Sequence, residues 1–231
     1  MPVTVHTTHP AALKIFAILE KVNTLQPMKH DVEEFMVTQV TRLLDEVLPW
    51  QRGHGFRTAQ IARRLGAAAG FASEILHHLT LASLLHDVGL LALPEQFTAH
   101  SECVDLESYA FIQCHPRVGA QWLEPFAFLK RASVIIAHHH ERWDGSGYPY
   151  GIRGTFIPIE ARVLAIADAF DAITVPGVED PNLRDAVAHR IVRAAAGTQF
   201  DPHLVELCRE ACTCHFTGSD GCNTSVLGLD D

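Results

Sequence analysis

Apolar residues recur at three- and four-residue intervals along most of the chain, and this helical period limits the folds open to it. Pro27 separates the first two helical segments, Pro49 closes the second, and Gly66 is expected to stop the third. The run Ser133 to Ile136 could form a strand, but the sequence offers no second run to pair with it. Helices are expected over 11–22, 31–48, 55–65, 72–87, 105–123 (with a kink or a change of helix at Pro116), 128–140, 159–173, 183–196 and 201–212. The sequence therefore predicts an all-α bundle.

The chain has 231 residues, of which 48% are hydrophobic, so it can bury one sizeable core. We expect a main domain over residues 51–196, after an N-terminal helical extension, 1–50, and before a C-terminal helix and Cys-rich tail, 197–231. The irregular stretch Asp144 to Pro158 is long for a loop inside a compact domain, and such loops are usually functional or disordered.

The net charge of −9 argues against a nucleic-acid polymer or an anionic membrane surface as the main partner. A small anionic ligand held through metal ions stays possible, because bound cations dominate the local field. Without a long uncharged apolar run, the sequence predicts no membrane span. The first ten residues do not resemble a secretory signal, so we expect a cytoplasmic protein with reduced thiols.

Histidine is unusually frequent, at 15 of 231 residues, and neutral imidazole is the commonest protein metal ligand. Potential ligands recur at intervals of about one helix and its return, which in a bundle can bring them to one depth. These are His54, His86-Asp87, His115, His139-His140 and Asp168. Singly, most have simpler explanations, such as helix capping for His54 or a turn before Pro116 for His115. Asp168 is different, because an ionised carboxylate in an apolar helix is costly unless it is paired or bound to metal.

The motifs around these residues make the family recognisable. His86-Asp87 lies in LLHDVGLLALPE, and residues 139–149 read HHERWDGSGYP, which matches the pattern HHExxDGxGYP. His54 with Arg57 fits HxxR, His115-Pro116 with Gly119 fits HPxxGA, and residues 157–172 match the next block. Over roughly residues 50–175 the chain resembles the HD-GYP branch of the HD superfamily of metal-dependent phosphohydrolases.

The resemblance implies an HD-superfamily helical bundle that hydrolyses cyclic di-GMP through a hydroxide activated by two metal ions. It assigns Asp87 and His86 to catalysis, with Asp87 bridging the ions. The implied metal ligands are His54, His86, Asp87, His115, His139, His140 and Asp168. Mixed nitrogen and oxygen ligands favour two divalent transition-metal ions, iron or manganese, over structural zinc. When residues 139–149 are aligned with the family pattern, His138 is not among the implied ligands.

Other implied features concern the substrate and partners. Gly147, Tyr148 and Pro149 would shape the loop beside the site, with Arg142 and Arg162 as further candidates for substrate binding. In the family this loop is also associated with GGDEF-type cyclase proteins, which makes such a protein a possible partner. Some members hold a third metal through a Glu four residues before the first His; here that residue is Trp50, which favours two ions.

The sequence departs from the family pattern at two points that concern phosphate. Leu90 replaces the Lys of the common HDxGK motif, and residues 173–179 lack the basic RPYK-like segment. We therefore expect metal binding to persist, action on cyclic di-GMP to be weak, and the linear product pGpG to accumulate. The alternatives are a degenerate scaffold that binds metal, ligand or partner proteins with little turnover, and a phosphohydrolase of another cyclic dinucleotide.

The remaining cysteines and histidines lie outside this pattern. Four thiols near the C-terminus could hold zinc or an iron–sulfur cluster, or simply stay reduced and unpaired. They are Cys208, Cys212, Cys214 and Cys222. His77, His78 and His203 are expected to be solvated or to cap helices.

Overall fold

The structure is a computed structural model that describes residues 9–25, 29–93, 110, 112–174 and 181–212. Its elements are α1 (Pro10–Thr24), α2 (His30–Val47), η1 (Pro49–Gln51), α3 (His54–Ala68), α4 (Ser73–Leu85), η2 (Val88–Ala92), α7 (His115–Leu123), η3 (Ala127–Leu129), α8 (Lys130–Ala137), η4 (Gly154–Phe156), α9 (Ile159–Thr174), α10 (Pro181–Ala194) and α11 (Pro202–Ala211). Over these ranges there is no strand, only an isolated bridge between Ala196 and Phe200. The all-α prediction is confirmed, and the run Ser133 to Ile136 is helical, within α8.

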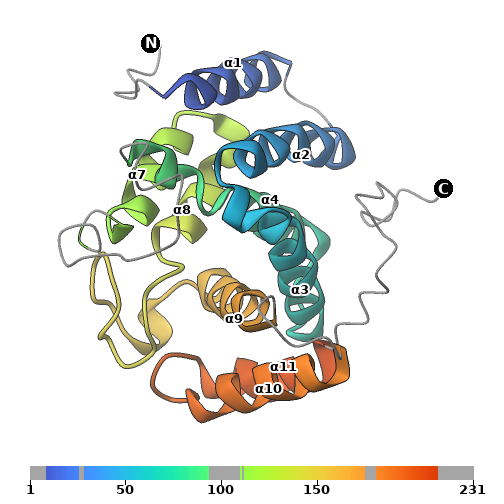
Figure 1. Cartoon of the computed structure of the whole chain (residues 1–231), viewed down its shortest axis with the longest axis vertical. Helices are drawn as coiled ribbons and strands as arrows, with labels where there is room; N and C mark the ends of the chain where they lie inside the picture. The colour runs from blue at the N-terminus through green and yellow to red at the C-terminus, as the bar shows by residue number, and fades with distance from the viewer. Residues whose placement is uncertain (1–8, 26–28, 94–109, 111, 175–180, 213–231) are drawn as a thin grey trace.

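Helix α4 lies at the centre of the bundle. It packs against α2, α3, α8 and α9, and its residues from Leu79 to Leu85 are buried without interruption. Figure 1 shows α1 and α2 at one end of the long axis and α10 and α11 at the other. By length and hydropathy the segment Ser73–Ala92 could cross a membrane, yet 72% of the window that passes this test is buried inside the protein. Its apolar character is that of a core helix.

Two details of the helix boundaries differ from the sequence reading. Helix α3 continues through Gly66 to Ala68, so the prediction that Gly66 stops it is wrong. A Cβ at Gly66 would lie 2.9 Å from a methyl group of Leu76, so its small size serves the close packing of α3 on α4. Pro116 stands in the first turn of α7, where its missing N–H has no helical acceptor to lose. Residues 105–109 of that predicted helix lie outside the described residues.

Both predicted appendages share the main hydrophobic core. Helix α2 packs against α4, and α11 packs against α3 and α10. Leu44 of α2 and Leu204 of α11 belong to the same buried cluster as the residues of α4. The boundaries at residues 50 and 196 stay a prediction. Cys208 and Cys212 are buried in this core, whereas Cys103, Cys214 and Cys222 lie outside the described residues.

Candidate metal centre

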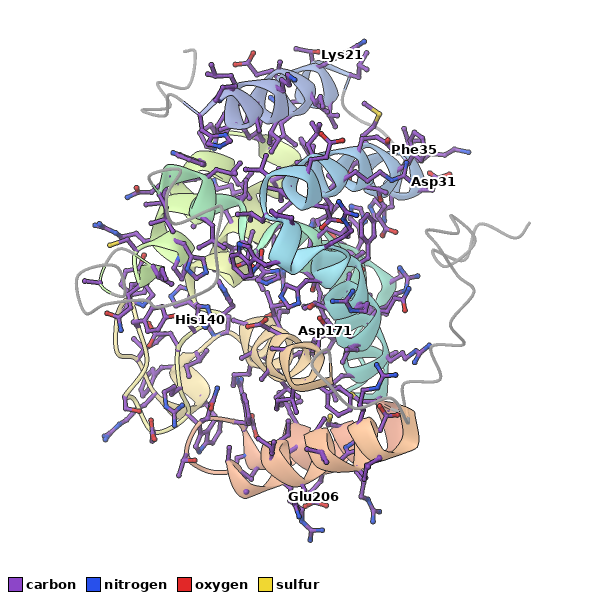
Figure 2. The ribbon with its side chains drawn as sticks, viewed as in Figure 1. Lys21, Asp31, Phe35, His140, Asp171 and Glu206 are labelled. Carbon is purple, nitrogen blue, oxygen red and sulfur yellow. The ribbon has the colours of Figure 1, made fainter. Side chains whose placement is uncertain are left out.

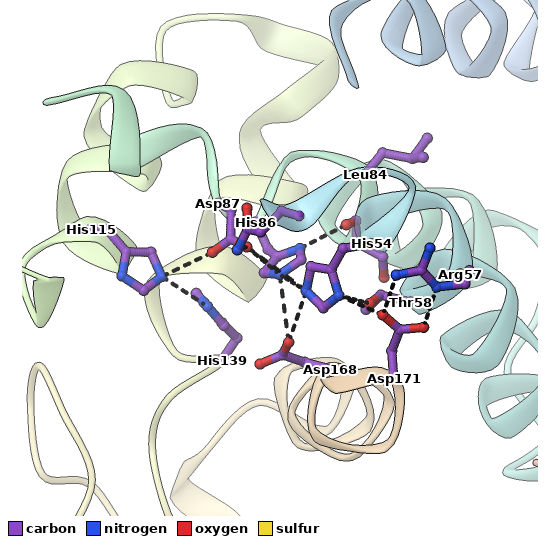
Figure 3. A network of polar contacts seen from close by, with 12 residues as sticks. His54, Arg57, Thr58, Leu84, His86, Asp87, His115, His139, Asp168 and Asp171 are labelled. Carbon is purple, nitrogen blue, oxygen red and sulfur yellow. Dashed lines mark hydrogen bonds and ion pairs between the residues drawn. The ribbon is translucent and has the colours of Figure 1, made fainter. Parts of the chain in front are cut away.

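The seven predicted ligands come together in the interior although they lie on five separate segments. His54 is the first residue of α3 and His115 the first of α7. His86-Asp87 directly follow α4, and His139-His140 follow α8 after the C-cap residue His138. Only Asp168 comes from within a helix, α9. Figure 3 shows six of them around one centre, and His140, labelled in Figure 2, lies between the two ends of the bundle.

The first group consists of His54, His86 and Asp87, whose donor atoms lie within 4.8 Å of one another. The Nε2 atoms of His54 and His86 are 3.2 Å apart. Asp168 adjoins this group, because its Oδ1 lies 3.1 Å from Nε2 of His54 and 3.8 Å from Nε2 of His86. The second group consists of His115, His139 and His140, also within 4.8 Å, with 3.3 Å between the Nε2 atoms of His115 and His139.

Asp87 connects the two groups through its two carboxylate oxygens. Its Oδ2 lies 3.1 Å from Nε2 of His86 in the first group, and its Oδ1 lies 3.3 Å from Nε2 of His115 in the second. A carboxylate that presents one oxygen to each of two donor groups has the arrangement needed to bridge two ions. The bridging role implied by the resemblance is therefore sterically available to Asp87.

The hydrogen bonds of the imidazole rings test whether this cluster suits a cation. Nδ1 of His86, His115 and His139 lies 2.8, 2.7 and 2.7 Å from the carbonyl oxygens of Ser83, Ile112 and Ile136. A carbonyl can only accept, so each Nδ1 carries the proton and each Nε2 of a neutral ring presents a lone pair. Lone pairs of His115 and His139 therefore face each other across 3.3 Å. Two facing lone pairs repel, and a bound cation would remove the repulsion. The donor set fits divalent metal ions.

The protonation of the rings leads to the same conclusion. Burial and, to a smaller extent, the nearby His115 lower the pKa of His140 to about 4, so this ring is neutral near pH 7. Burial also opposes a charge on His54, but hydrogen bonds to Asp168 and Asp171 outweigh it and raise the pKa of His54 to about 10. Without metal, a proton on His54 thus balances the carboxylates, and a bound ion would replace it.

Two residues that support the ligands escaped the sequence reading. Asp171, buried in α9, accepts from Nδ1 of His54 at 2.7 Å and from Nε and a terminal nitrogen of Arg57 at 2.7 and 3.0 Å. Such a carboxylate fixes the orientation of a ligand histidine. Gln51 of η1 donates from Nε2 to Oδ2 of Asp87 at 2.6 Å. Asp171 could have been found from the sequence, because it is a second acidic residue in an apolar helix, three positions after Asp168. No sequence signal indicated Gln51.

Two glycines permit the close approaches that assemble the site. A Cβ at Gly89 would lie 2.1 Å from the carbonyl oxygen of His115, so only glycine lets η2 contact the start of α7. A Cβ at Gly147 would lie 2.3 Å from the backbone nitrogen of Arg142. This second approach brings Tyr148 to the ligand segment, where its backbone N–H donates to the carbonyl of His140 at 3.2 Å and its ring lies 4.9 Å from that of His140.

A cavity of about 220 Å³ opens onto the cluster. It is lined by Leu48, Trp50, Gln51, Asp87, Leu90, Leu93, Ile112, His115, His140, Tyr148 and Asp168. Leu90 is only 5% exposed and its side chain faces this cavity, whereas its neighbours Val88 and Leu91 belong to the hydrophobic core. Among the described residues that line the cavity there is no lysine or arginine.

The predicted substrate-binding residues are dispersed. Tyr148 lines the cavity; Gly147 and Pro149, its neighbours, do not. Arg142 donates to Ser146 at 2.9 Å within its own loop. Arg162 donates to the carbonyl of Ile157 at 3.0 Å and pairs with Asp201, which ties α9 to the start of α11. Neither arginine is among the cavity-lining residues, so the structure does not bring them to the ligands.

Comparisons with known proteins agree with this geometry. The HD domain family model matches residues 38–204. The 3'3'-cGAMP-specific phosphodiesterase 2 of Vibrio cholerae serotype O1 is 36% identical over 160 residues, which are 68% of this chain and 30% of that protein. The cyclic di-GMP phosphodiesterase response regulator RpfG of Xanthomonas campestris pv. campestris is 33% identical over 154 residues, 65% of this chain and 40% of that protein. The chain thus spans less than half the length of these two relatives.

The fold has solved counterparts as well. The crystal structure of the cyclic GMP-AMP-specific phosphodiesterase V-cGAP3 of V. cholerae superposes with a TM-score of 0.61 at 23% sequence identity, covering 77% of this chain and 47% of that one. At this identity the likeness concerns the fold. The family match extends over more than half of the chain and includes every residue of the candidate metal centre. The chain therefore belongs to the HD domain family.

Proposed function

We propose that this protein hydrolyses one phosphodiester bond of a cyclic dinucleotide at a centre of two divalent ions, iron or manganese, with cyclic di-GMP as the first candidate substrate. The observation that carries the proposal is the placement of Asp87 between two groups of histidine ligands, beside an open cavity. Cyclic dinucleotide hydrolysis is the activity named for both curated relatives.

The protein's own residues have separable tasks in this proposal. His86, His115 and His139 are held by backbone carbonyls so that each Nε2 faces the centre. Asp171 and Arg57 orient His54, and Gln51 orients Asp87. When bound, the ions would supply a nucleophilic hydroxide at neutral pH and neutralise phosphate oxygens. Two divalent ions would more than balance the carboxylates of Asp87 and Asp168, leaving positive charge for an anionic substrate.

The cavity lining supports slow rather than fast turnover of cyclic di-GMP. Leu90 contributes an apolar surface where the family pattern has a lysine, and none of the described lining residues is a lysine or an arginine. The ions alone would then hold the phosphate. The linear product pGpG has an additional terminal phosphate, and we expect it to accumulate because no basic side chain in the described lining favours its rebinding.

A second candidate substrate is 3'3'-cGAMP. The relative that is 36% identical to this chain over 160 residues is specific for that molecule. It shares the phosphodiester chemistry of cyclic di-GMP and differs in one purine, so the metal centre would not distinguish the two. A scaffold that binds ligand with little turnover is the third possibility, and contact of the loop around Tyr148 with a GGDEF-type protein, together with a cytoplasmic location, stays a prediction.

The decisive experiment is an assay of purified protein, loaded separately with iron and manganese, against cyclic di-GMP, 3'3'-cGAMP and cyclic di-AMP. We expect hydrolysis of at least one of them, with loss of activity on chelation and recovery on adding metal back. Asp87→Ala is the matched inactive control. If the metal-replete protein binds these molecules without cleaving any, the scaffold interpretation replaces ours.

The contribution of Leu90 can be measured directly. Leu90→Lys would place a charge-assisted hydrogen-bond donor beside the phosphate, worth roughly 1.5–3 kcal/mol, or about a 10- to 100-fold effect. We expect kcat/KM for cyclic di-GMP to rise at least severalfold with unchanged metal content. Thermal melting serves as the control for folding. A well-folded, metal-replete variant without any gain would show that Leu90 does not limit turnover.

A further inference from the structure

The two groups of ligands differ in what supports them. In the second group, Nδ1 of His115 and of His139 each donates to a backbone carbonyl at 2.7 Å. In the first group, part of the support comes from side chains of distant segments. Gln51 donates through its side-chain amide to Asp87 at 2.6 Å, although 36 positions separate the two residues. A backbone support is fixed by the helix end that provides it, whereas a side-chain support depends on how separate segments pack.

The hydrogen bond from Gln51 reaches one side of Asp87. It ends on Oδ2, the oxygen that lies 3.1 Å from Nε2 of His86 in the first group. The other oxygen, Oδ1, lies 3.3 Å from Nε2 of His115 in the second group, and no side-chain amide contacts it among the described residues. A carboxylate oxygen has two lone pairs, so Oδ2 can accept from Gln51 and still offer a lone pair to a cation. The contact is compatible with a bridging carboxylate, and it acts on the side of the first group.

The place of Gln51 is fixed by the packing of the bundle. It is the last residue of η1, and its backbone N–H donates at 2.8 Å to the carbonyl of the buried Leu48. Helix α2, which directly precedes Leu48, packs against α4, and α4 directly precedes His86 and Asp87. The side chain of Gln51 also lines the cavity. The amide therefore reaches the carboxylate from a segment that is held in place, as a supporting residue must.

We propose that Gln51 is a positioning residue that makes the two ion positions unequal, because it holds Oδ2 of Asp87 toward the ion of the first group. The inference rests on the two-ion centre of the proposed function. Loss of a residue that supports a metal ligand typically lowers metal affinity by about 10- to 100-fold. Here the loss should fall on the first position, whose ion no longer meets an oriented Oδ2. The second position keeps the imidazoles of His115, His139 and His140.

The test compares Gln51→Met with wild type, because methionine has about the same length and no N–H donor. Titration with Mn²⁺, followed by calorimetry and by electron paramagnetic resonance, measures the binding of each ion without turnover. We expect one dissociation constant to rise about 10- to 100-fold and the other to change by less than about threefold. At Mn²⁺ concentrations between the two constants, Gln51→Met should show the hyperfine pattern of an isolated ion, whereas wild type shows the broad spectrum of two coupled ions.

A second variant assigns the weakened position to the first group. Asp171→Asn acts on His54, a ligand of that group. It should weaken the same position as Gln51→Met, so the double variant should still bind the other ion as wild type does. If the double variant instead loses both ions, the two residues act on different positions and the inference is wrong.

Gln121→Met is the matched control. Gln121 is an exposed glutamine of α7, the helix that begins with His115, and its substitution should leave both dissociation constants unchanged. Thermal melting checks folding, and Gln51→Asn, whose amide is too short to reach Asp87 in the same way, takes the place of Gln51→Met if that variant does not fold. Unchanged constants, or an equal rise of both, would overturn the inference and leave the proposed function intact. A selective loss in a protein that cleaves no cyclic dinucleotide would support the inference and contradict only the proposed function.

Discussion

Two clusters in this bundle combine histidines with carboxylates, and they are built in opposite ways. The metal centre is one. The other, the His77 cluster, consists of His30, Glu33 and Glu34 of α2 and His77 of α4. Nε2 of His77 lies 2.8 Å from Glu33 and Nδ1 lies 3.0 Å from Glu34, while the ring of His30 stacks on it at 3.9 Å. His77 is 3% exposed, so the prediction that it is solvated or caps a helix is wrong.

The difference lies in what the second ring nitrogen meets. In the His77 cluster both nitrogens meet a carboxylate, so both carry protons, and the charged ring is balanced by the two acids. In the metal centre, His86, His115 and His139 each donate from one nitrogen to a backbone carbonyl, and the other nitrogen faces a histidine or Asp87. His54 is the exception, because its nitrogens face the carboxylates of Asp171 and Asp168. The first arrangement needs no ion and joins α2 to α4. The second leaves imidazole lone pairs facing each other, which a bound cation would satisfy. Histidine content alone does not separate these roles.

The largest expected effect comes from breaking the centre at Asp87. Asp87→Ala should lose both ions, because the two carboxylate oxygens face separate ligand groups. Hydrolysis should fall by more than about 100-fold, since loss of a residue that only supports a ligand already costs about 10- to 100-fold. Elemental analysis and the hydrolysis assay measure both effects. Retention of a full metal complement would contradict the bridging role, and Trp50→Ala should leave the metal count unchanged.

Breaking the His77 cluster should affect stability instead of metal binding. His77→Leu leaves Glu33 and Glu34 buried without their partner, a loss of about 3–5 kcal/mol. At roughly 2–4 °C per kcal/mol for a chain of this size, Tm should fall by about 6–20 °C. His203→Ala, at an exposed position in α11, is the control. If His77→Leu does not fold, the milder His77→Gln should show a smaller fall. Melting at the wild-type temperature would mean that the cluster contributes nothing.

Asp171→Asn tests a buried carboxylate that contacts a histidine, as Glu33 does. The histidine that Asp171 contacts is the candidate ligand His54. The variant keeps the size of the side chain and removes the charge that faces His54 and Arg57. We expect metal affinity to fall by about 10- to 100-fold. Competition with a chelator of known affinity measures the change, and the exposed loop variant Asp144→Asn should match wild type. An unchanged metal affinity would show that Asp171 has a purely structural role, like Glu33 and Glu34.

The smallest expected effect is a pH dependence of stability that arises in the His77 cluster. Burial opposes the charge on His77, but the hydrogen bonds to Glu34 and Glu33 outweigh it and raise its pKa above 6.5. A raised pKa means that the stabilisation is complete below about pH 6.5 and is lost as pH rises through the folded-state value. The charged neighbours are Glu33 and Glu34 of α2, with His30 stacked on the ring, His78 beside it and Arg63 of α3 near Glu34.

The measurement is Tm of wild type and His77→Gln, both saturated with metal, from about pH 6 to about pH 9. Changes that arise at the metal ligands then cancel in the difference. The advantage of wild type should shrink as pH rises. An advantage that grows toward high pH would show that His77 is neutral in the folded protein.

Local spacing was enough to predict most of the helices and to single out the residues that gather in the candidate metal centre. The helical period extends over stretches of ten residues or more, and four of the ligand positions lie at helix ends, where the chain turns. The motifs around His86-Asp87 and His139-His140 are contiguous, so they could be recognised before any fold was known. Gly66 led to a wrong prediction for the end of α3, because tight packing and helix termination both favour glycine.

The tertiary structure decided which side chains meet. His54 and Asp171 are 117 positions apart in the sequence, and the 43 positions between His77 and Glu34 separate two helices that pack side by side. The same kind of packing turned Leu90 and Trp50 toward the cavity and moved Arg162 to Asp201. Sequence alone determined that this chain carries helices and a set of potential metal ligands, because both are expressed in local patterns. Whether a given histidine binds a metal ion or a neighbouring carboxylate depended on contacts between distant segments, which form only when the helices pack.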